Sequence, residues 1–460
     1  MTRANMGFPH FVSVVVAYSS PKDLPSDDHL IRRIDELQEH FPLLYAALRG
    51  TKTRGPFFQQ GETHWSKDRI IRRMQYSATG NDGAKVLQDE MKRLDKLHLE
   101  SDPLWQVALY TASDDSPAYL VVSGHHALTD GKAVFNLTDA LLAADISHLP
   151  YEQVDKVPLL SDTHDLRPGL LYILGLIWTA LLVPKLPARI QPYLRPAHAW
   201  PDTGIRRPAS KCEGRFSLLE LPHSLIDSLK VAGRQNGVKT LHPILTISYA
   251  TAIWHVMRGS SDSLVIRAST PSNIRDLSLG HGYCTGNYVG SAPVTFVPRP
   301  ETDFWAETAQ VAIDMSSKAS KKRALELMGA LSYVPDPAPD LAKRDTDRPT
   351  GWEQFFGETM ESAVPYSDTM SISNIGRVKL PPKAADLFWA QGASPMAPPF
   401  TINVVGHEKG LRVTPTWRDG AVVDEDDVKR VDEVWERILN RLANPLWKGR
   451  TLQELTQERI

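Results

Sequence analysis

The chain has 460 residues, of which 42% are hydrophobic and 23% are charged, a composition typical of a folded globular protein. A single hydrophobic core stops growing at about 250–300 residues, so this length predicts two lobes. The net charge is -2, and no overall field therefore favours nucleic acid as a partner. The two cysteines, Cys212 and Cys284, are too few for a disulfide framework and form no CxxC pair for zinc, which favours the cytosol.

Strands and helices alternate along residues 1–165, which predicts an α/β first lobe. Phe11–Tyr18 is rich in β-branched residues and is typical of a strand. The apolar residues of Asp28–His40 recur with a helical period. Further helices are predicted at Asp89–Leu99 and Gly131–Ala144, and further strands at Leu104–Tyr110 and Ala118–Ser123.

Residues 166–212 are predicted to form a crossover between the lobes, because prolines are concentrated between Pro150 and Pro208. Within the crossover, Gly169–Val183 carries no charge. Its length of about 15 residues is short of the roughly 20 that span a bilayer, so the segment predicts a buried helix. An alternative is contact with a membrane surface, because five basic residues follow the segment. They are Lys185, Arg189, Arg195, Arg206 and Arg207.

Residues 213–460 are predicted to form the second lobe. Strands are predicted at Arg215–Leu221, Ser263–Ala268, Tyr288–Val297, Met370–Ile375, Phe400–Val405 and Leu411–Pro415. Helices are predicted at Pro222–Arg234, Thr240–Met257 and Asp424–Leu442. Pro335–Pro349 is dense in Pro and Asp, which predicts a solvated loop.

The motif His125-His126-Ala127-Leu128-Thr129-Asp130-Gly131 directly follows the predicted strand Ala118–Ser123. Neighbouring side chains of a strand point to opposite faces, so only one of the two histidines can face a reaction channel. An imidazole takes and returns a proton near neutral pH, which suits activation of a hydroxyl or amine that attacks an acyl group. A structural alternative is that Thr129 or Asp130 caps the helix starting near Gly131.

His-His-x-x-x-Asp-Gly resembles the signature of the CoA-dependent acyltransferases related to chloramphenicol acetyltransferase. That superfamily includes plant alcohol acyltransferases, peptide-synthetase condensation domains and fungal alcohol O-acetyltransferases. The resemblance implies an α/β fold of two lobes, each a mixed sheet flanked by helices, with a channel between them. It also implies that His126 is the general base, that Asp130 is structural and that His125 supports the motif.

Three later segments extend the resemblance. Pro271-Ser272-Asn273-Ile274-Arg275 is similar to an element whose arginine pairs with the motif aspartate, and a buried Asp130 needs such a partner because an unpaired buried carboxylate is costly. Ser371-Ile372-Ser373-Asn374-Ile375-Gly376 resembles the family's Ser-Asn-Leu-Gly strand and offers Ser373 and Asn374 as oxyanion donors. Gly286-Asn287-Tyr288-Val289 and the carboxy-terminal strands resemble the fungal alcohol O-acetyltransferases, whereas the Asp-Phe-Gly-Trp-Gly of the plant branch is missing.

These features predict an acyl-CoA-dependent O-acyltransferase, acting with acetyl-CoA on a small alcohol or secondary metabolite in fungal secondary metabolism. The resemblance implies no metal and no bound cofactor. Alternatives are an N-acyltransferase, a carrier-protein-dependent condensation-type acyltransferase, and a non-catalytic binding module on the same fold. We expect a cytoplasmic monomer, with peripheral contact at the endoplasmic reticulum or a lipid droplet surface as the alternative location.

Overall fold

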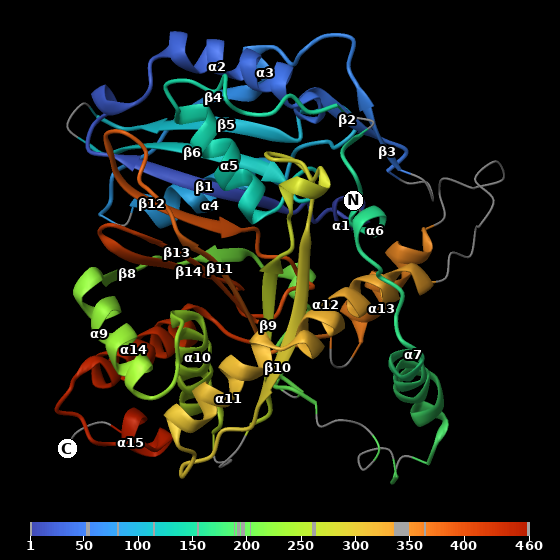
Figure 1. Ribbon diagram of the computed structural model, residues 1–460, viewed down its shortest axis with the longest axis vertical. Coiled ribbons are helices and arrows are strands. Elements are labelled where there is room, and N and C mark those ends of the chain that lie inside the picture. The colour runs from blue at the N-terminus through green and yellow to red at the C-terminus, as the bar shows by residue number, and fades with distance from the viewer. Residues whose placement is uncertain are drawn as a thin grey trace.

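The computed structural model describes residues 2–457 apart from 52–55, 81, 114–115, 154–155, 188, 191–193, 195–197, 203, 260–263, 335–348 and 363–364. Two lobes, each a mixed sheet flanked by helices, lie one above the other (Figure 1). The chain thus has the two-lobed α/β fold that the sequence predicts. Of the predicted loop Pro335–Pro349, all but residue 349 lies outside the described residues.

The first lobe is built on a five-stranded sheet of order β12-β1-β6-β5-β4. Its interior strand β1 is antiparallel to both β6 and β12. Alternate residues of β1 enter two different cores: Val14 packs in a core with helices α2 and α5, and Val15 packs in a core with α4. Both faces of the sheet are therefore covered, which explains why every residue of β1 is buried.

The elements of the first lobe have the following bounds. The strands of its main sheet are β1 Phe11–Tyr18, β4 Ile71–Gln75, β5 Trp105–Thr111, β6 Ala118–His125 and β12 Ala384–Gln391. A separate hairpin joins β2 Ala46–Arg49 to β3 Phe57–Gln60. The helices are α1 Thr2–Asn5, α2 Asp27–His40, α3 Lys67–Ile70, α4 Asp82–Leu94 and α5 Gly131–Leu142.

The second lobe is built on a seven-stranded sheet of order β10-β9-β11-β13-β14-β7, with β8 also paired to β14. Strand β11 is parallel to both of its neighbours. Helix α10 is buried continuously from Pro243 to Trp254, because α14 and the sheet enclose it. The second lobe therefore has a core of its own.

The elements of the second lobe and the crossover have the following bounds. The strands are β7 Gly214–Phe216, β8 Leu219–Pro222, β9 Ile266–Asn273, β10 Val289–Phe296, β11 Met370–Arg377, β13 Phe400–His407 and β14 Gly410–Arg418. The helices are α6 Leu160–Thr163, α7 Leu170–Ile177, α9 His223–Gln235, α10 Leu241–Met257, α11 Phe304–Ser316, α12 Lys318–Ala330, α13 Gly351–Glu361, α14 Glu425–Ala443 and α15 Leu452–Thr456.

Strand β12 ties the two lobes together. It lies within the range predicted for the second lobe, yet it forms the edge of the first sheet beside β1. Its Trp389 donates an indole hydrogen bond to the carbonyl oxygen of Val404 on β13 at 3.0 Å. The chain thus crosses between the lobes again after residue 212, and the sheets share a buried joint.

The prediction that Gly169–Val183 forms a buried helix is wrong. Helix α7 contains no buried residue, and the side chain of Leu171 is 85% exposed. The helix contacts the body of the protein at its start, where the N–H of Gly169 donates to Glu326 on α12 at 3.0 Å, and then projects away from it (Figure 1). Among the described residues, no helix combines the length and apolar character needed to cross a membrane.

Candidate active site

Strand β6 presents the two histidines of the motif on opposite sides. It ends at His125, whose N–H donates to the carbonyl of Leu104 at 2.7 Å, while the N–H of His126 donates to the carbonyl of His10 at 2.8 Å. The His125 ring is 2% exposed and stands edge-on to Phe11. His126 is half-buried. Strand alternation therefore packs one imidazole inward and leaves the other open to solvent.

His126 lines an open pocket of about 420 Å³ between the lobes. The first lobe contributes the amino-terminal helix and the motif, and the second lobe contributes Asn287 and residues near α12 and α13. The lining residues are Thr2, Arg3, Ala4, His10, His125, His126, Ala127, Asn287, Leu331 and Phe356. A small molecule in this pocket would meet the His126 imidazole directly.

Two side chains hold the His126 ring in place. The ring of His10 stacks on it with 4.9 Å between the ring centres. From the other lobe, Nδ2 of Asn287 lies 3.0 Å from Nδ1 of His126 and 3.3 Å from its backbone oxygen. An imidazole held at Nδ1 leaves Nε2 as its second functional nitrogen.

The surroundings of His126 lower its pKa. Burial has the largest effect. Asp130 and the backbone of His126 itself raise the pKa, and the positive charge of Arg3 lowers it by a smaller amount. Burial also lowers the pKa values of His10 and His125 well below the usual value. The lowered pKa values favour the neutral form of all three imidazoles, the state that a general base requires.

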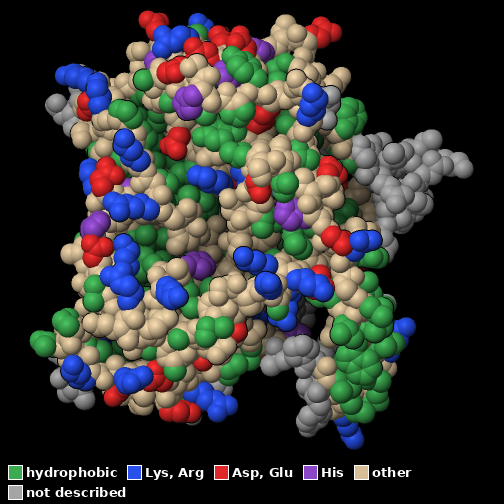
Figure 2. All heavy atoms as spheres, in the orientation of Figure 1, with side chains coloured by type: hydrophobic (Ala, Val, Ile, Leu, Met, Phe, Trp, Pro, Cys, Tyr) green, Lys and Arg blue, Asp and Glu red, His purple; other side chains and the backbone are tan. Residues whose placement is uncertain are grey.

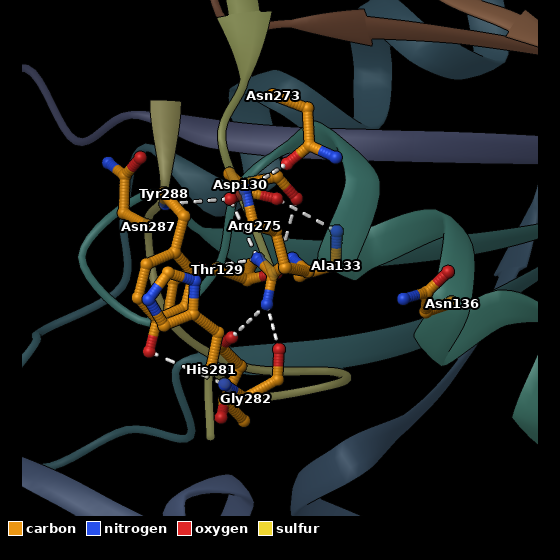
Figure 3. Close-up of polar contacts among 12 residues, drawn as sticks. Thr129, Asp130, Ala133, Asn136, Asn273, Arg275, His281, Gly282, Asn287 and Tyr288 are labelled. Atoms are coloured by element: carbon orange, nitrogen blue, oxygen red, sulfur yellow. Dashed lines mark hydrogen bonds and ion pairs between the residues drawn. The ribbon is translucent and has the colours of Figure 1, made fainter. Parts of the chain in front are cut away.

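Asp130 is fully buried, and its contacts engage both of its carboxylate oxygens (Figure 3). Oδ1 accepts from the N–H of Ala133 at 2.9 Å and so caps α5. Oδ2 accepts from Nη2 of Arg275 at 2.7 Å and from the N–H of Tyr288 at 2.9 Å. The helix cap and the arginine partner considered from the sequence are thus both present on one side chain.

Arg275 fastens the motif loop to the segment 282–288 of the second lobe. Besides the ion pair, its guanidinium donates to the carbonyls of Gly282, Thr285 and Gly286, and it lies 4.8 Å from the ring centre of Tyr288. The N–H of Gly286 donates to the carbonyl of Leu128 at 2.7 Å. This network fixes the position of Asn287 relative to His126.

Two glycines allow these close approaches. Gly286 has a φ of 82°, which favours glycine, and a Cβ there would lie 2.3 Å from the Tyr288 ring. A Cβ on Gly131 would lie 3.0 Å from Cδ1 of Ile375 on β11. The glycine that ends the motif therefore lets α5 approach the second lobe.

The predicted oxyanion residues lie on β11 but not in the His126 pocket. Oδ1 of Asn374 accepts from the N–H of Gly376 at 2.8 Å. Asn374 also lines a separate pocket of about 270 Å³ together with His242, Arg377, His407 and others. Neither Ser373 nor Asn374 is among the residues that line the pocket of His126. Their role stays a prediction.

Sequence reasoning missed His10 and Arg3 and did not assign a role to Asn287. His10 immediately precedes β1, and the register of Phe11 opposite His125 brings it to His126. That register depends on strand pairing across more than 100 residues, so no local pattern reveals it. Asn287 lies within the quoted Gly-Asn-Tyr-Val segment, and the signal for it was therefore present. Within the described residues, no group of three or more His, Cys, Asp or Glu side chains could hold a metal ion.

Comparison with known proteins shows similarity in fold. No family model and no curated protein matches the sequence. The first condensation domain of the calcium-dependent antibiotic synthetase, solved with a substrate analogue, matches with a TM-score of 0.60 and 15% identity over 96% of this chain and 93% of that chain. The condensation domain of the Monacolin K polyketide synthase MokA matches with a TM-score of 0.58 and 12% identity over 96% of this chain and 93% of that chain.

A third similar structure is the EpoB cyclization-docking bidomain from Sorangium cellulosum, with a TM-score of 0.59 and 12% identity over 95% of this chain and 81% of that chain. At such identities the likeness concerns the fold alone. The structural neighbours are condensation and related domains of synthetases. The chain therefore has the two-lobed, chloramphenicol-acetyltransferase-like fold of condensation domains.

Proposed function

We propose that this chain is an acyltransferase that moves an acyl group from a pantetheine thioester to a hydroxyl group, with His126 as the general base. The observation that carries the proposal is the state of His126. Its ring opens into a pocket between the lobes, two neighbours orient it, and burial lowers its pKa and so favours the neutral form. The Asp130 carboxylate is engaged by its own three partners and acts as a structural anchor.

In the proposed reaction, Nε2 of His126 removes the hydroxyl proton as the oxygen attacks the thioester carbonyl. The C–O bond forms, the tetrahedral intermediate collapses, the C–S bond breaks, and the imidazolium returns the proton to the departing thiolate. This step requires the His126 tautomer with hydrogen on Nδ1. Asn287 can accept this hydrogen only with its amide turned over, so that Oδ1 faces Nδ1, and that orientation gives up the Nδ2 bond to the backbone oxygen of His126.

Ser373 and Asn374 are the proposed donors to the oxyanion, with backbone amides as the alternative. Strand β11 is close to the motif, because Ile375 lies against Gly131 at the start of α5. Asn374 faces the second pocket, which Lys230 and Arg377 also line. We propose that the thioester approaches from this side, where the cations suit a phosphate, and that the hydroxyl substrate occupies the pocket of His126.

Two donors carry a pantetheine thioester, and different observations favour each. The motif and the Gly-Asn-Tyr-Val segment led to the prediction of acyl-CoA. The structural neighbours are condensation domains of peptide and polyketide synthetases, which favours a thioester bound to a carrier protein. On the structural comparison the carrier-bound donor is the better supported of the two.

The test compares acetyl-CoA with an acetylated carrier protein at equal concentration, each with a panel of alcohols and amines. Release of free thiol and the mass of the product are measured. Transfer to an alcohol that depends on His126 supports the proposal, and the faster donor identifies the thioester class. Transfer to amines alone would replace the O-acyltransferase with an N-acyltransferase. The absence of thiol release with both donors would contradict catalysis and favour a binding module.

A further inference from the structure

The most exposed apolar surface of the described crossover is α7 and the turn after it. Figure 2 shows apolar side chains gathered over this element at the lower right, beside Lys and Arg side chains. We call this surface the α7 knob, defined by seven side chains that are each at least 39% exposed. They are Leu170, Leu171, Leu174, Leu176, Ile177, Trp178 and Leu182.

Such a surface is costly in water. Monomeric soluble proteins rarely expose contiguous apolar patches of several large side chains, and those that do use them to bind a partner or a membrane. The knob lies on one continuous helical segment, because α7 continues through the helical turns Trp178–Leu182 and Val183–Lys185 without a break. The exposed apolar side chains therefore lie on a continuous helical segment and not on an irregular loop.

The charges around the knob indicate what covers it. The sequence has no Asp or Glu between Asp165 and Asp202, whereas it has Arg167, Lys185, Arg189 and Arg195 there. In the described structure Lys185 and Arg189 are exposed directly after the knob. Glu326 binds the start of the helix at Gly169, whereas Lys185 and Arg189 follow its far end. An apolar surface with cations at its far end complements a lipid bilayer with anionic headgroups, where the cations meet phosphate and the side chains enter the acyl boundary.

The dimensions of the knob limit how it can bind. The helical segment from Leu170 to Lys185 is about 24 Å long at 1.5 Å per residue, whereas the hydrocarbon core of a bilayer is about 30 Å thick. The exposed Trp178 at 43% is of the residue type that is enriched at the membrane interface. The element suits insertion into one leaflet and is too short to cross both.

We propose that the α7 knob docks the protein on the surface of an anionic lipid bilayer, with the apolar side chains inserted in one leaflet and Lys185 and Arg189 against the headgroups. This surface lies apart from the pocket of His126 and does not depend on the chemistry there. Peripheral membrane contact is the alternative that the sequence left open for this segment.

The test is co-sedimentation of the full chain with phosphatidylcholine vesicles, with and without about one third phosphatidylserine. The wild-type chain is expected to bind the anionic vesicles. The variant Leu171→Asn with Leu174→Asn is expected to lower the partition coefficient at least about tenfold, because two exposed leucines no longer enter the bilayer. The matched control, Phe57→Asn with Val231→Asn, changes two exposed apolar residues outside the knob and is expected to bind as the wild type does.

A second arm tests the charges. Lys185→Ser with Arg189→Ser is expected to lower binding to anionic vesicles by about fivefold for each cation and to leave binding to phosphatidylcholine unchanged. Equal binding of all variants, or no vesicle binding by the wild type, would overturn the proposal. Sedimentation velocity without lipid tests the main alternative, in which the knob binds a second copy of the chain. The knob would be assigned to a second copy of the chain if two results came together. The wild type would form a dimer that the Leu171→Asn with Leu174→Asn variant does not form, and the wild type would not bind vesicles.

Discussion

The burial of His126 and the charges around it set the pH dependence of the proposed reaction. The working form of a general base is unprotonated, so the rate rises with pH through the pKa of the base and is level above it. Burial, with a smaller contribution from Arg3, holds the pKa of His126 below its usual value of 6.5 against the opposing effect of Asp130. We therefore expect the acid limb of the kcat/KM profile to lie below pH 6.5.

Arg3 gives this expectation a direct test. Its positive charge disfavours protonation of His126, so Arg3→Gln should raise the pKa and move the acid limb to higher pH. Arg32→Gln, which changes an exposed arginine on α2, serves as the control and should leave the limb in place. An acid limb that stays fixed, or moves to lower pH, in the Arg3→Gln variant would contradict the role of Arg3.

The motif itself could be predicted from its spacing, because strand alternation separates His125 from His126 and an Asp before a helix is a natural cap. The orientation of the His126 ring could not. It depends on His10, which strand pairing brings alongside, and on Asn287, which comes from the other lobe. Local patterns carry no information about contacts between segments this far apart.

At the scale of elements, the Asp130–Arg275 pair joins the start of α5 to the segment after β9. Both side chains are almost fully buried, at 0% and 3% exposure, and lie 2.7 Å apart. Removing one partner of such a pair leaves an uncompensated buried charge and costs about 3–5 kcal/mol. Asp130→Asn and Arg275→Met should each lower the free energy of unfolding by this amount.

A double-mutant cycle decides whether the two residues act together. Because they are in direct contact, the double variant should be more stable than the sum of the single effects predicts, with a coupling of at least about 1 kcal/mol. The exposed pair Arg73–Asp27 provides the comparison and should couple by about 0.5 kcal/mol or less. Strictly additive effects at Asp130 and Arg275 would refute the structural role of their contact.

Helices with a clear apolar face were predictable as elements. The predicted helices Asp28–His40 and Asp424–Leu442 match α2 and α14 to within one residue at each end. The helix predicted at Asp89–Leu99 is α4, Asp82–Leu94, because its buried Val86 and Leu87 precede the predicted start. The strand predicted at Ser263–Ala268 is β9, Ile266–Asn273, and its residue 263 lies outside the described part of the chain.

The predicted burial of the segment that forms α7 was wrong for a different reason. A stretch that is apolar on all sides indicates burial only if the protein supplies a surface to bury it, and composition cannot show whether that surface belongs to the same molecule. The predicted second lobe likewise could not reveal that β12 joins the first sheet, since that pairing is set by the packing of the whole molecule.

At the scale of the whole molecule, the two lobes meet through β12, the motif loop and the segment that Arg275 binds. This joint places His126 at a pocket to which both lobes contribute. The fold is shared with condensation domains, but a fold alone does not specify the donor or the acceptor. The chemistry of this chain therefore has to be tested at the pocket.

The most direct test of the account is the rate of thiol release from the preferred thioester by the wild type and by His126→Ala. A general base contributes about 10²–10⁴-fold, so His126→Ala should lower kcat by that factor with an unchanged circular dichroism spectrum. His98→Ala, at an exposed histidine, should retain the full rate, whereas His125→Ala should act mainly by lowering thermal stability, because its ring is buried against Phe11. A His126→Ala variant that keeps the wild-type rate would contradict the role of His126 as the general base.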